Sequence, residues 1–199
     1  KELGWHYLDS GSIYRSLAIS VLNTSVGVEN IPKILELAET MHLSFECADE
    51  FKVKLNEFDI TLRLGLEETG RVASIIAAYP EVRAVLLQKQ KNFRLFPGLV
   101  ADGRDMGTVV FPDAQFKVFL TASAEVRANR RYKQLKEKEI DANLTQITRD
   151  IEERDRRDQE RAAAPLTMAP DALYIDSSEM TLEEVTSEVM NLVHNGLNR

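Results

Sequence analysis

Two short polar loops in this sequence carry side chains that could do chemistry, and the first is Asp102-Gly103-Arg104-Asp105. It follows Leu99–Ala101, an apolar run that predicts a short buried strand. A carboxylate placed there could hold Mg²⁺ or one of its water ligands, and the glycine would let a ligand approach the backbone closely. An ordinary polar exit from a strand is the alternative.

The second loop, Asp9-Ser10-Gly11-Ser12, lies between a strand candidate at Trp5–Leu8 and a helix candidate at Ile13–Leu22. Arg15 follows within the first turn of that helix. Backbone N–H groups at the start of a helix bind anions such as phosphate, so this loop is a candidate anion site. A plain helix N-cap fits the same residues.

A charged stretch, Glu125–Arg161, holds 11 of the 25 basic residues and 10 acidic ones, so its own charge is about +1 and the rest of the chain carries about −8. Within it, Arg154, Asp158 and Arg161 lie within about 60° of one another on one helix face. Two guanidiniums beside one carboxylate could bind a phosphate and a neighbouring sugar hydroxyl. Intrahelical salt bridges on a solvated face are the alternative.

Three further arginines, Arg127, Arg130 and Arg131, lie near one another on an expected helix from Ala124 to Lys138. None of them has a glutamate four residues away, so neutralisation within the helix does not readily explain them. They are candidates for binding phosphate, with a solvated helix face as the alternative.

The composition excludes several classes of protein. The chain has 199 residues and a net charge of −7, which argues against a general nucleic-acid coat protein. Its only cysteine, Cys47, allows no internal disulfide and favours a reducing compartment. No apolar run approaches the roughly 18 residues of a membrane span. The three histidines are scattered without metal-ligand spacing, and phosphoryl transfer needs no histidine because positioning and charge stabilisation do most of its work.

Short apolar strands that alternate with helices predict an α/β fold, in which a parallel sheet has helices on both faces. Ligands of such sheets bind beyond the carboxyl ends of the strands, where both polar loops lie. Besides Trp5–Leu8 and Leu99–Ala101, the expected strands are Phe116–Leu120, in the core, and Ala172–Ile175. The expected helices are Ile13–Leu22, Pro32–Met41, Arg71–Ala78, Pro80–Phe93, Ala124–Lys138 with Ser123 as its cap, Leu144–Arg161, and a last one from the capping box Thr181–Glu184 to about Gly196.

One part of the chain has a different period. The runs Leu43–Cys47, Phe51–Leu55 and Phe58–Leu64 alternate apolar and polar residues with period two. They predict a small antiparallel sheet with one wet face, inserted as a subdomain at about residues 40–70.

The motifs Leu8–Arg15 (LDSGSIYR), Ala101–Pro112 (ADGRDMGTVVFP) and Glu153–Asp158 (ERDRRD), with Ala164-Pro165-Leu166, closely resemble bacterial cytidylate kinases. The resemblance runs essentially from end to end, and the second motif is very specific. It implies a nucleoside monophosphate kinase of the P-loop type, with one kinase domain over 1–199 and a helical lid at about 130–160. It also implies transfer of a phosphoryl group from ATP with Mg²⁺ to CMP or dCMP, by a cytoplasmic monomer with no nucleic-acid or membrane partner.

By matching position, the resemblance implies roles for single residues in acceptor binding. Contacts to the acceptor phosphate fall on Ser10 and Arg15, helped by Arg104 and Arg161. The cytosine readers are Ser74, Arg83 and Asp105. This set is chemically sensible, because a carboxylate accepts from the exocyclic amine of cytosine while Arg and Ser address the ring carbonyl and nitrogen.

The remaining implied roles concern the ribose, the lid and the metal. Arg154 and Asp158 resemble the ribose contacts, and Arg130 and Arg131 match lid arginines that close over the transferring phosphoryl group. By analogy with related nucleotide kinases, Asp102 is a candidate for holding the water shell of Mg²⁺.

The sequence departs from the family at its start. Kinases of this type begin with a strand and a glycine-rich loop, GxxxxGK[ST], and no such string occurs here, where position 1 is Lys and the first Met is Met41. We expect the first strand and the phosphate loop to lie upstream, and activity to require them. A non-catalytic nucleotide-binding domain without the loop is the second hypothesis. An RNA-binding protein is a third, disfavoured because acidic residues interleave in Glu125–Arg161 and aromatic residues are nearly absent there.

Overall fold

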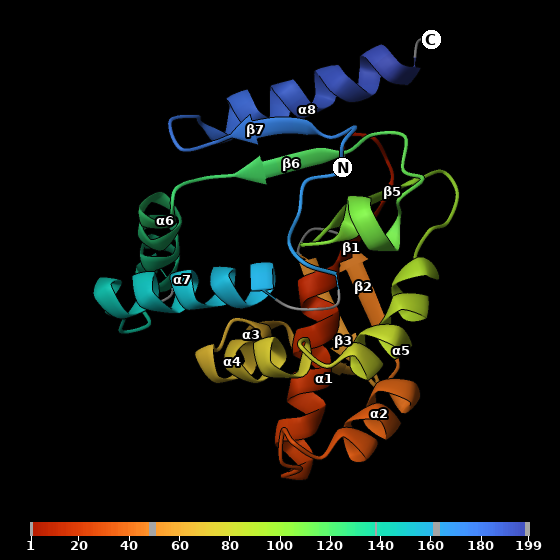
Figure 1. Cartoon of the computed structure of the whole chain (residues 1–199), viewed down its shortest axis with the longest axis vertical. Helices are drawn as coiled ribbons and strands as arrows, with labels where there is room; N and C mark the ends of the chain where they lie inside the picture. The colour runs from red at the N-terminus through yellow and green to blue at the C-terminus, as the bar shows by residue number, and fades with distance from the viewer. Residues whose placement is uncertain (1, 48–50, 138, 161–163, 198–199) are drawn as a thin grey trace. The chain divides into compact units, whose positions relative to one another are not determined.

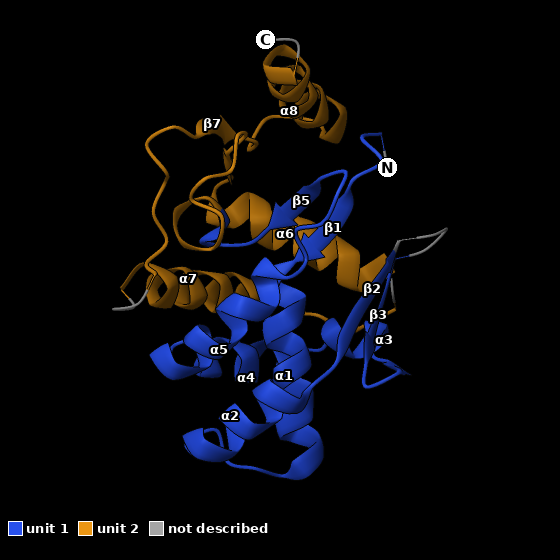
Figure 2. Cartoon of the chain, turned by 90° about the vertical axis from the view of Figure 1, so that its right-hand side faces the viewer, with its two compact units in different colours: residues 1–106 blue, residues 107–199 orange. Residues whose placement is uncertain are grey.

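The computed structural model describes residues 2–47, 51–137, 139–160 and 164–197. The chain divides into two compact units, Lys1–Met106 and Gly107–Arg199, which are coloured separately in Figure 2. Each unit contains a pair of parallel strands, so the mixed α/β class expected from the sequence is confirmed. The structure shows these strands as two separate two-stranded sheets, and a third sheet is antiparallel.

Unit 1 begins with β1 (His6–Asp9), which leads directly into the long helix α1 (Ser10–Thr24), as Figure 1 shows. The parallel partner of β1 is β5 (Leu99–Asp102), with Leu8 opposite Ala101 and Asp9 opposite Asp102. Asp9 caps α1, because its Oδ1 accepts a hydrogen bond of 3.1 Å from the backbone N–H of Ser12. The cap fixes the point where the strand ends and the helix begins.

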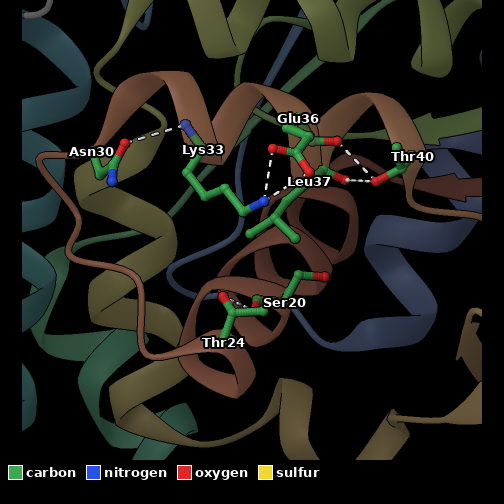
Figure 3. Close-up of polar contacts among 7 residues, drawn as sticks. All are labelled: Ser20, Thr24, Asn30, Lys33, Glu36, Leu37 and Thr40. Atoms are coloured by element: carbon green, nitrogen blue, oxygen red, sulfur yellow. Dashed lines mark hydrogen bonds and ion pairs between the residues drawn. The ribbon is translucent and has the colours of Figure 1, made fainter.

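The helix α2 (Ile31–Thr40) confirms the expectation for Pro32–Met41. Figure 3 shows its polar contacts: Asn30 caps the helix by accepting a hydrogen bond of 3.3 Å from the N–H of Lys33, and the Thr40 hydroxyl donates to the Glu36 carbonyl at 2.8 Å. The exposed ion pair of Lys33 and Glu36, at 2.7 Å, contributes little, since water solvates both charges. Burial of Ile34 and Ala38 therefore holds the helix in place.

The small antiparallel sheet is confirmed as β2 (Leu43–Cys47), β3 (Phe51–Leu55) and β4 (Phe58–Asp59), in that order. The expected third strand to Leu64 is wrong in its second half, where Thr61–Leu64 forms the short helix α3. The side chain of Asp59 accepts a hydrogen bond of 2.8 Å from the N–H of Thr61, which turns the chain. Thr61 Oγ1 in turn accepts from the N–H of Val53 at 3.0 Å and ends the ladder.

Two helices complete unit 1: α4 (Glu67–Ile76) and α5 (Pro80–Lys91), with Pro80 in the first turn as expected. Near the end of α5, Lys89 Nζ donates hydrogen bonds to the carbonyls of Glu39 and Met41, at 3.1 and 3.0 Å. These carbonyls lie at the end of α2, so Lys89 ties the two helix ends together.

Unit 2 contains β6 (Val118–Thr121) and its parallel partner β7 (Leu173–Asp176), with the helices α6 (Ala124–Glu137), α7 (Leu144–Glu160) and α8 (Leu182–Leu197). A π-helical turn at Met106–Val110 precedes β6. Ala128, Leu135 and Ile147 pack α6 against α7. The caps expected at Ser123 and at the box Thr181–Glu184 are both formed.

The expected buried strand Leu99–Ala101 and core strand Phe116–Leu120 are exposed in part, which corrects the sequence analysis. Val100 and Leu120 keep 44 % and 56 % of their surface in contact with solvent. Each parallel sheet of the described residues has only two strands, and so narrow a sheet leaves its residues less covered than a parallel sheet with helices on both faces. Among the described residues, no helix has the length and apolar character needed to cross a membrane.

Candidate functional site

The two polar loops expected to do chemistry lie next to each other in unit 1. The parallel register places Asp9 opposite Asp102 at the carboxyl ends of β1 and β5. The residues that follow are in close contact, because a Cβ on Gly103 would lie only 2.9 Å from the Cβ of Ser10 and 3.0 Å from the side chain of Met106. Position 103 must therefore be glycine for the two loops to approach this closely.

We expect Gly103→Ala to lower the free energy of unfolding by about 1–3 kcal/mol, the usual range for an overpacked site. The added methyl group would force Ser10 or Met106 aside. Chemical denaturation measures the effect. Gly65→Ala is the matched control, since the nearest atom to its added Cβ, the Leu62 carbonyl oxygen, lies at an ordinary 3.5 Å. Equal losses in both variants would contradict the tight approach at Gly103.

The carboxyl group of Asp102 is electrostatically strained. The pKa of Asp102 is raised above its ordinary value, first by the loss of water around the carboxyl group and then by the negative charge of Asp9. Arg104 and the N–H of Gly103 oppose the shift. The residue as a whole still has exposed surface, so the carboxyl group is only partly desolvated. Its charge thus makes the metal-free protein less stable at neutral pH.

Asp102→Asn is therefore expected to raise the melting temperature at pH 7 in the presence of a chelator. An acid whose pKa is higher in the folded state destabilises that state above the folded pKa, and the penalty disappears as falling pH protonates the carboxyl group. The gain should vanish in acid. Asp171→Asn is a control of opposite sign, because the hydrogen bond from Lys117 lowers the pKa of Asp171. That variant should lose stability at pH 7, and a gain in both variants would refute this electrostatic account.

Ser10, at the start of α1, is 4 % exposed, and its hydroxyl donates a hydrogen bond of 2.7 Å to Oε1 of Gln90. Gln90 was missed in the sequence analysis. The buried face of α5 includes Val82, Leu86 and Gln90, which are spaced four residues apart. An amide on a face that is otherwise apolar was the sequence signal that could have marked Gln90 as a buried polar residue.

Arg15 is held by residues of α3 and α4. Its Nη1 donates a hydrogen bond to the carbonyl of Leu64, at the end of α3. A Cβ on Gly70 of α4 would lie 3.3 Å from the nearest guanidinium nitrogen of Arg15, so α4 passes closely beside this group. The side chain is thus fixed in direction within unit 1.

Arg83 and Asp105 form a buried ion pair, with the residues 9 % and 5 % exposed. Nη2 of Arg83 donates to Oδ2 of Asp105, and Nη1 donates to the carbonyl of Ala77 at 3.4 Å. The guanidinium also lies over the ring of Tyr14, 5.7 Å from its centroid. Of the three expected base readers, the structure thus joins two directly, and Ser74 lies half-buried on α4.

In unit 2, Arg154 and Asp158 lie on the same face of α7, as their spacing predicted. Arg154 Nε is 3.8 Å from Oδ2 of Asp158, which is the intrahelical ion pair named as the alternative reading. Asp158 is only 8 % exposed, and its backbone carbonyl accepts a hydrogen bond of 2.8 Å from the N–H of Leu166. Arg161, the third residue of the predicted group, lies outside the described residues.

The arginines of α6 have different partners. Arg130 donates to the hydroxyl and the carbonyl of Ser177, at 3.1 and 2.6 Å, just after β7. Arg127 forms an ion pair of 2.5 Å with Asp155 of α7. Arg131 lies half-buried on α6. The solvated face named as the alternative is therefore wrong for Arg127, whose charge joins two helices.

Metal-ligating side chains are sparse. Across the described part of the chain, no group of three or more His, Cys, Asp or Glu side chains could together hold a metal ion. Asp9 and Asp102 lie at paired positions of β1 and β5, and two carboxylates suit a cation that keeps most of its water ligands.

Comparisons with known proteins agree with one another. The family model described as "Cytidylate kinase" matches residues 1–195. A cytidylate kinase of Methylococcus capsulatus is 53 % identical over 192 residues, which are 96 % of this chain and 86 % of that protein. Cytidylate kinases of Aeromonas salmonicida and Photobacterium profundum are 50 % and 48 % identical, over 96 % and 99 % of this chain and 83 % and 87 % of theirs.

Proposed function

Because this chain belongs to the cytidylate kinase family, we propose that it transfers the γ-phosphoryl group of ATP to CMP or dCMP and gives CDP or dCDP. It is a phosphotransferase of a family of kinases that use ATP. The hypothesis of a non-catalytic binding domain is therefore not retained. What remains to be proposed is which residues carry out each part of the reaction.

The buried pair of Arg83 and Asp105 is the observation that supports a cytosine site most directly. The carboxylate can only accept hydrogen bonds, and the exocyclic amine of cytosine can donate one to it. Uracil has a carbonyl oxygen at that position, which would face the carboxylate without a proton between them. Arg83 has further N–H groups that can donate to the ring nitrogen and carbonyl of cytosine, and Ser74 supplies a third polar group.

The acceptor phosphate is proposed to bind at the start of α1. Ser10 and Arg15 lie in the first two turns of this helix, whose first N–H groups favour an anion. Arg104, in the adjacent loop after β5, adds a second guanidinium within unit 1. Arg161 keeps its proposed role in the same contact from the sequence resemblance alone.

Residues of unit 2 are proposed to serve the ribose and the transferring group. Asp158 can accept from a ribose hydroxyl while Arg154, its ion-pair partner, donates to a second oxygen. Arg130 and Arg131 are proposed to stabilise the negative charge that spreads over the phosphoryl oxygens during transfer. In the structure Arg130 donates to Ser177, and its guanidinium has further N–H groups that can donate to a phosphoryl oxygen.

Mg²⁺ fits the carboxylates of unit 1. Asp102 is proposed to hold water ligands of the ion. A divalent cation there would offset the two causes of the raised pKa of Asp102, the loss of water around its carboxyl group and then the negative charge of Asp9. When bound with ATP, the ion neutralises negative charge on the phosphate oxygens.

Several predictions from the sequence resemblance stay part of this proposal. They are the fold of a P-loop nucleoside monophosphate kinase, one kinase domain with an inserted subdomain at about 40–70 and a lid at about 130–160, the phosphate loop upstream, a cytoplasmic location, and a monomer without nucleic-acid or membrane partners. The coding sequence upstream of Lys1 tests the phosphate loop directly.

The activity is tested with protein expressed from the complete coding sequence, ATP and Mg²⁺. We expect kcat/KM for CMP or dCMP to exceed that for UMP and AMP by at least about 100-fold, because a site built around hydrogen bonds strongly rejects bases that leave its buried groups unpaired. Equal rates with UMP would contradict the proposed role of Arg83 and Asp105. The chelator EDTA should abolish the reaction if Mg²⁺ is required.

A further inference from the structure

We propose that Gln90 is a positioning residue for acceptor binding, and that its side-chain amide sets the direction in which the Ser10 hydroxyl donates its proton. The inference rests on the proposed function, in which Ser10 contacts the acceptor phosphate. It adds to that function a residue that does not touch the substrate and acts only through Ser10.

The contact between the two side chains is buried and joins distant parts of unit 1. Ser10 Oγ lies 2.7 Å from Gln90 Oε1, and the residues are 4 % and 2 % exposed. The amide nitrogen of Gln90 donates to the carbonyl of Leu86 at 3.3 Å. A buried amide destabilises a fold unless its polar atoms are paired, and here both are paired. An apolar side chain would fill this face of α5 more simply, so the amide at position 90 calls for a role.

The hydrogen-bond inventory of the two groups supplies that role. A serine hydroxyl has one proton, and a phosphate dianion only accepts. While Ser10 donates to Oε1 of Gln90, it has no proton for a phosphate oxygen. If the amide of Gln90 turns over, its N–H group donates to Ser10 Oγ and the hydroxyl proton is free to point at the phosphate.

The pair thus has two arrangements, and no covalent bond changes between them. In the first, which the structure shows, Ser10 donates to Gln90 and Gln90 donates to Leu86. In the second, Gln90 donates to Ser10 and Ser10 donates to the acceptor phosphate, while the carbonyl of Leu86 loses its bond from the amide. We infer that acceptor binding shifts the pair from the first arrangement to the second.

The experiment is a double-mutant cycle on Ser10 and Gln90, with Gln90→Met chosen because it keeps the volume and removes the amide. For Gln90→Met, KM for CMP should fall about 3- to 10-fold, because the free protein loses both hydrogen bonds of the first arrangement while the bound state loses only the one from Gln90 to Ser10, a net difference of one neutral hydrogen bond. The values of kcat and of KM for ATP should change less than about two-fold. In the Ser10→Ala background, Gln90→Met should change KM for CMP by less than about two-fold, because the group it acts through is gone.

Gln88→Met is the matched control. Gln88 is exposed on the same helix and donates a hydrogen bond of 2.8 Å to Asn92. It should leave KM for CMP unchanged. If Gln90→Met does not fold, as circular dichroism would show, Gln90→Asn replaces it and carries the same expectations, since its amide is one methylene short of Ser10.

The outcomes separate this inference from the proposed function. If Gln90→Met raises KM for CMP, or changes it equally in both backgrounds, Gln90 does not act by competing for the Ser10 proton and the inference is wrong. If Ser10→Ala raises KM for CMP but Gln90→Met leaves it unchanged, the inference is wrong and the role of Ser10 stands. If Ser10→Ala itself leaves KM for CMP unchanged, the proposed role of Ser10 fails, and the inference fails with it.

Discussion

Asp105→Ala is expected to lower the free energy of unfolding by about 3–5 kcal/mol, which is the range for removing one partner of a buried ion pair. The variant would leave Arg83 without the carboxylate that compensates its charge, although both residues are at least nine-tenths buried. The Ala77 carbonyl and the Tyr14 ring would remain as its partners, and neither carries a full negative charge. Urea denaturation of the nucleotide-free protein measures the loss.

A double variant sharpens this test. Arg83→Met combined with Asp105→Leu removes both charges, so we expect it to be more stable than Asp105→Ala alone. The exposed pair of Lys33 and Glu36 is the matched control, and Glu36→Ala should change the free energy of unfolding by less than about 1 kcal/mol. If Asp105→Ala is no more harmful than Glu36→Ala, the pair does not carry a buried charge.

Asp105→Asn separates stability from base recognition. The side chain keeps its shape and still offers Arg83 an oxygen, so its loss of stability should be smaller than that of Asp105→Ala. Its amide nitrogen can now donate to the carbonyl oxygen of uracil, so the ratio of kcat/KM for CMP over UMP should fall. An unchanged ratio would show that Asp105 does not read the base.

Arg15→Met is expected to reduce kcat/KM for CMP by roughly 10- to 150-fold, which corresponds to the about 1.5–3 kcal/mol of a hydrogen bond to a charged group. The Leu64 carbonyl and the close approach of Gly70 fix the direction of the Arg15 guanidinium, which is the group proposed to bind the acceptor phosphate. Initial rates at varied CMP and saturating ATP give the value.

The control for Arg15 is Arg71→Met, which removes an exposed arginine of α4 and should leave kcat/KM for CMP within about two-fold. Both variants remove one positive charge and make the net charge one unit more negative, so any general electrostatic effect on the nucleotide is matched. A similar loss in the two variants would mean that Arg15 acts by charge at a distance rather than by contact.

The parts of the structure that could be predicted from the sequence are those with a local period or a local cap. The position of Pro80 in α5 and the box Thr181–Glu184 follow from residues a few positions apart. The helix expected from Ile13 begins earlier, at Ser10, because Asp9 caps it by accepting from the N–H of Ser12. The strand expected through Leu64 failed because Asp59 bonds to the backbone two residues later, and that bond overrides the alternation of side chains.

The parts that could not be predicted depend on partners far along the chain. Ser10 and Gln90 are 80 residues apart, and Arg130 meets Ser177 across 47. No local pattern states which of several possible distant polar groups a side chain will meet.

The register of β1 and β5 also determines where the chain can change in length. Side chains alternate between the two faces of a strand, so one added residue within His6–Leu8 would turn the fully buried Leu8 outward and displace Asp9 from Asp102. The turn at 25–30 is mostly exposed, and an inserted residue there does not change the register of any strand. In a library of single-residue insertions selected for growth, the surviving variants should carry insertions in the turn at 25–30. We expect no surviving variant with an insertion in β1 or β5.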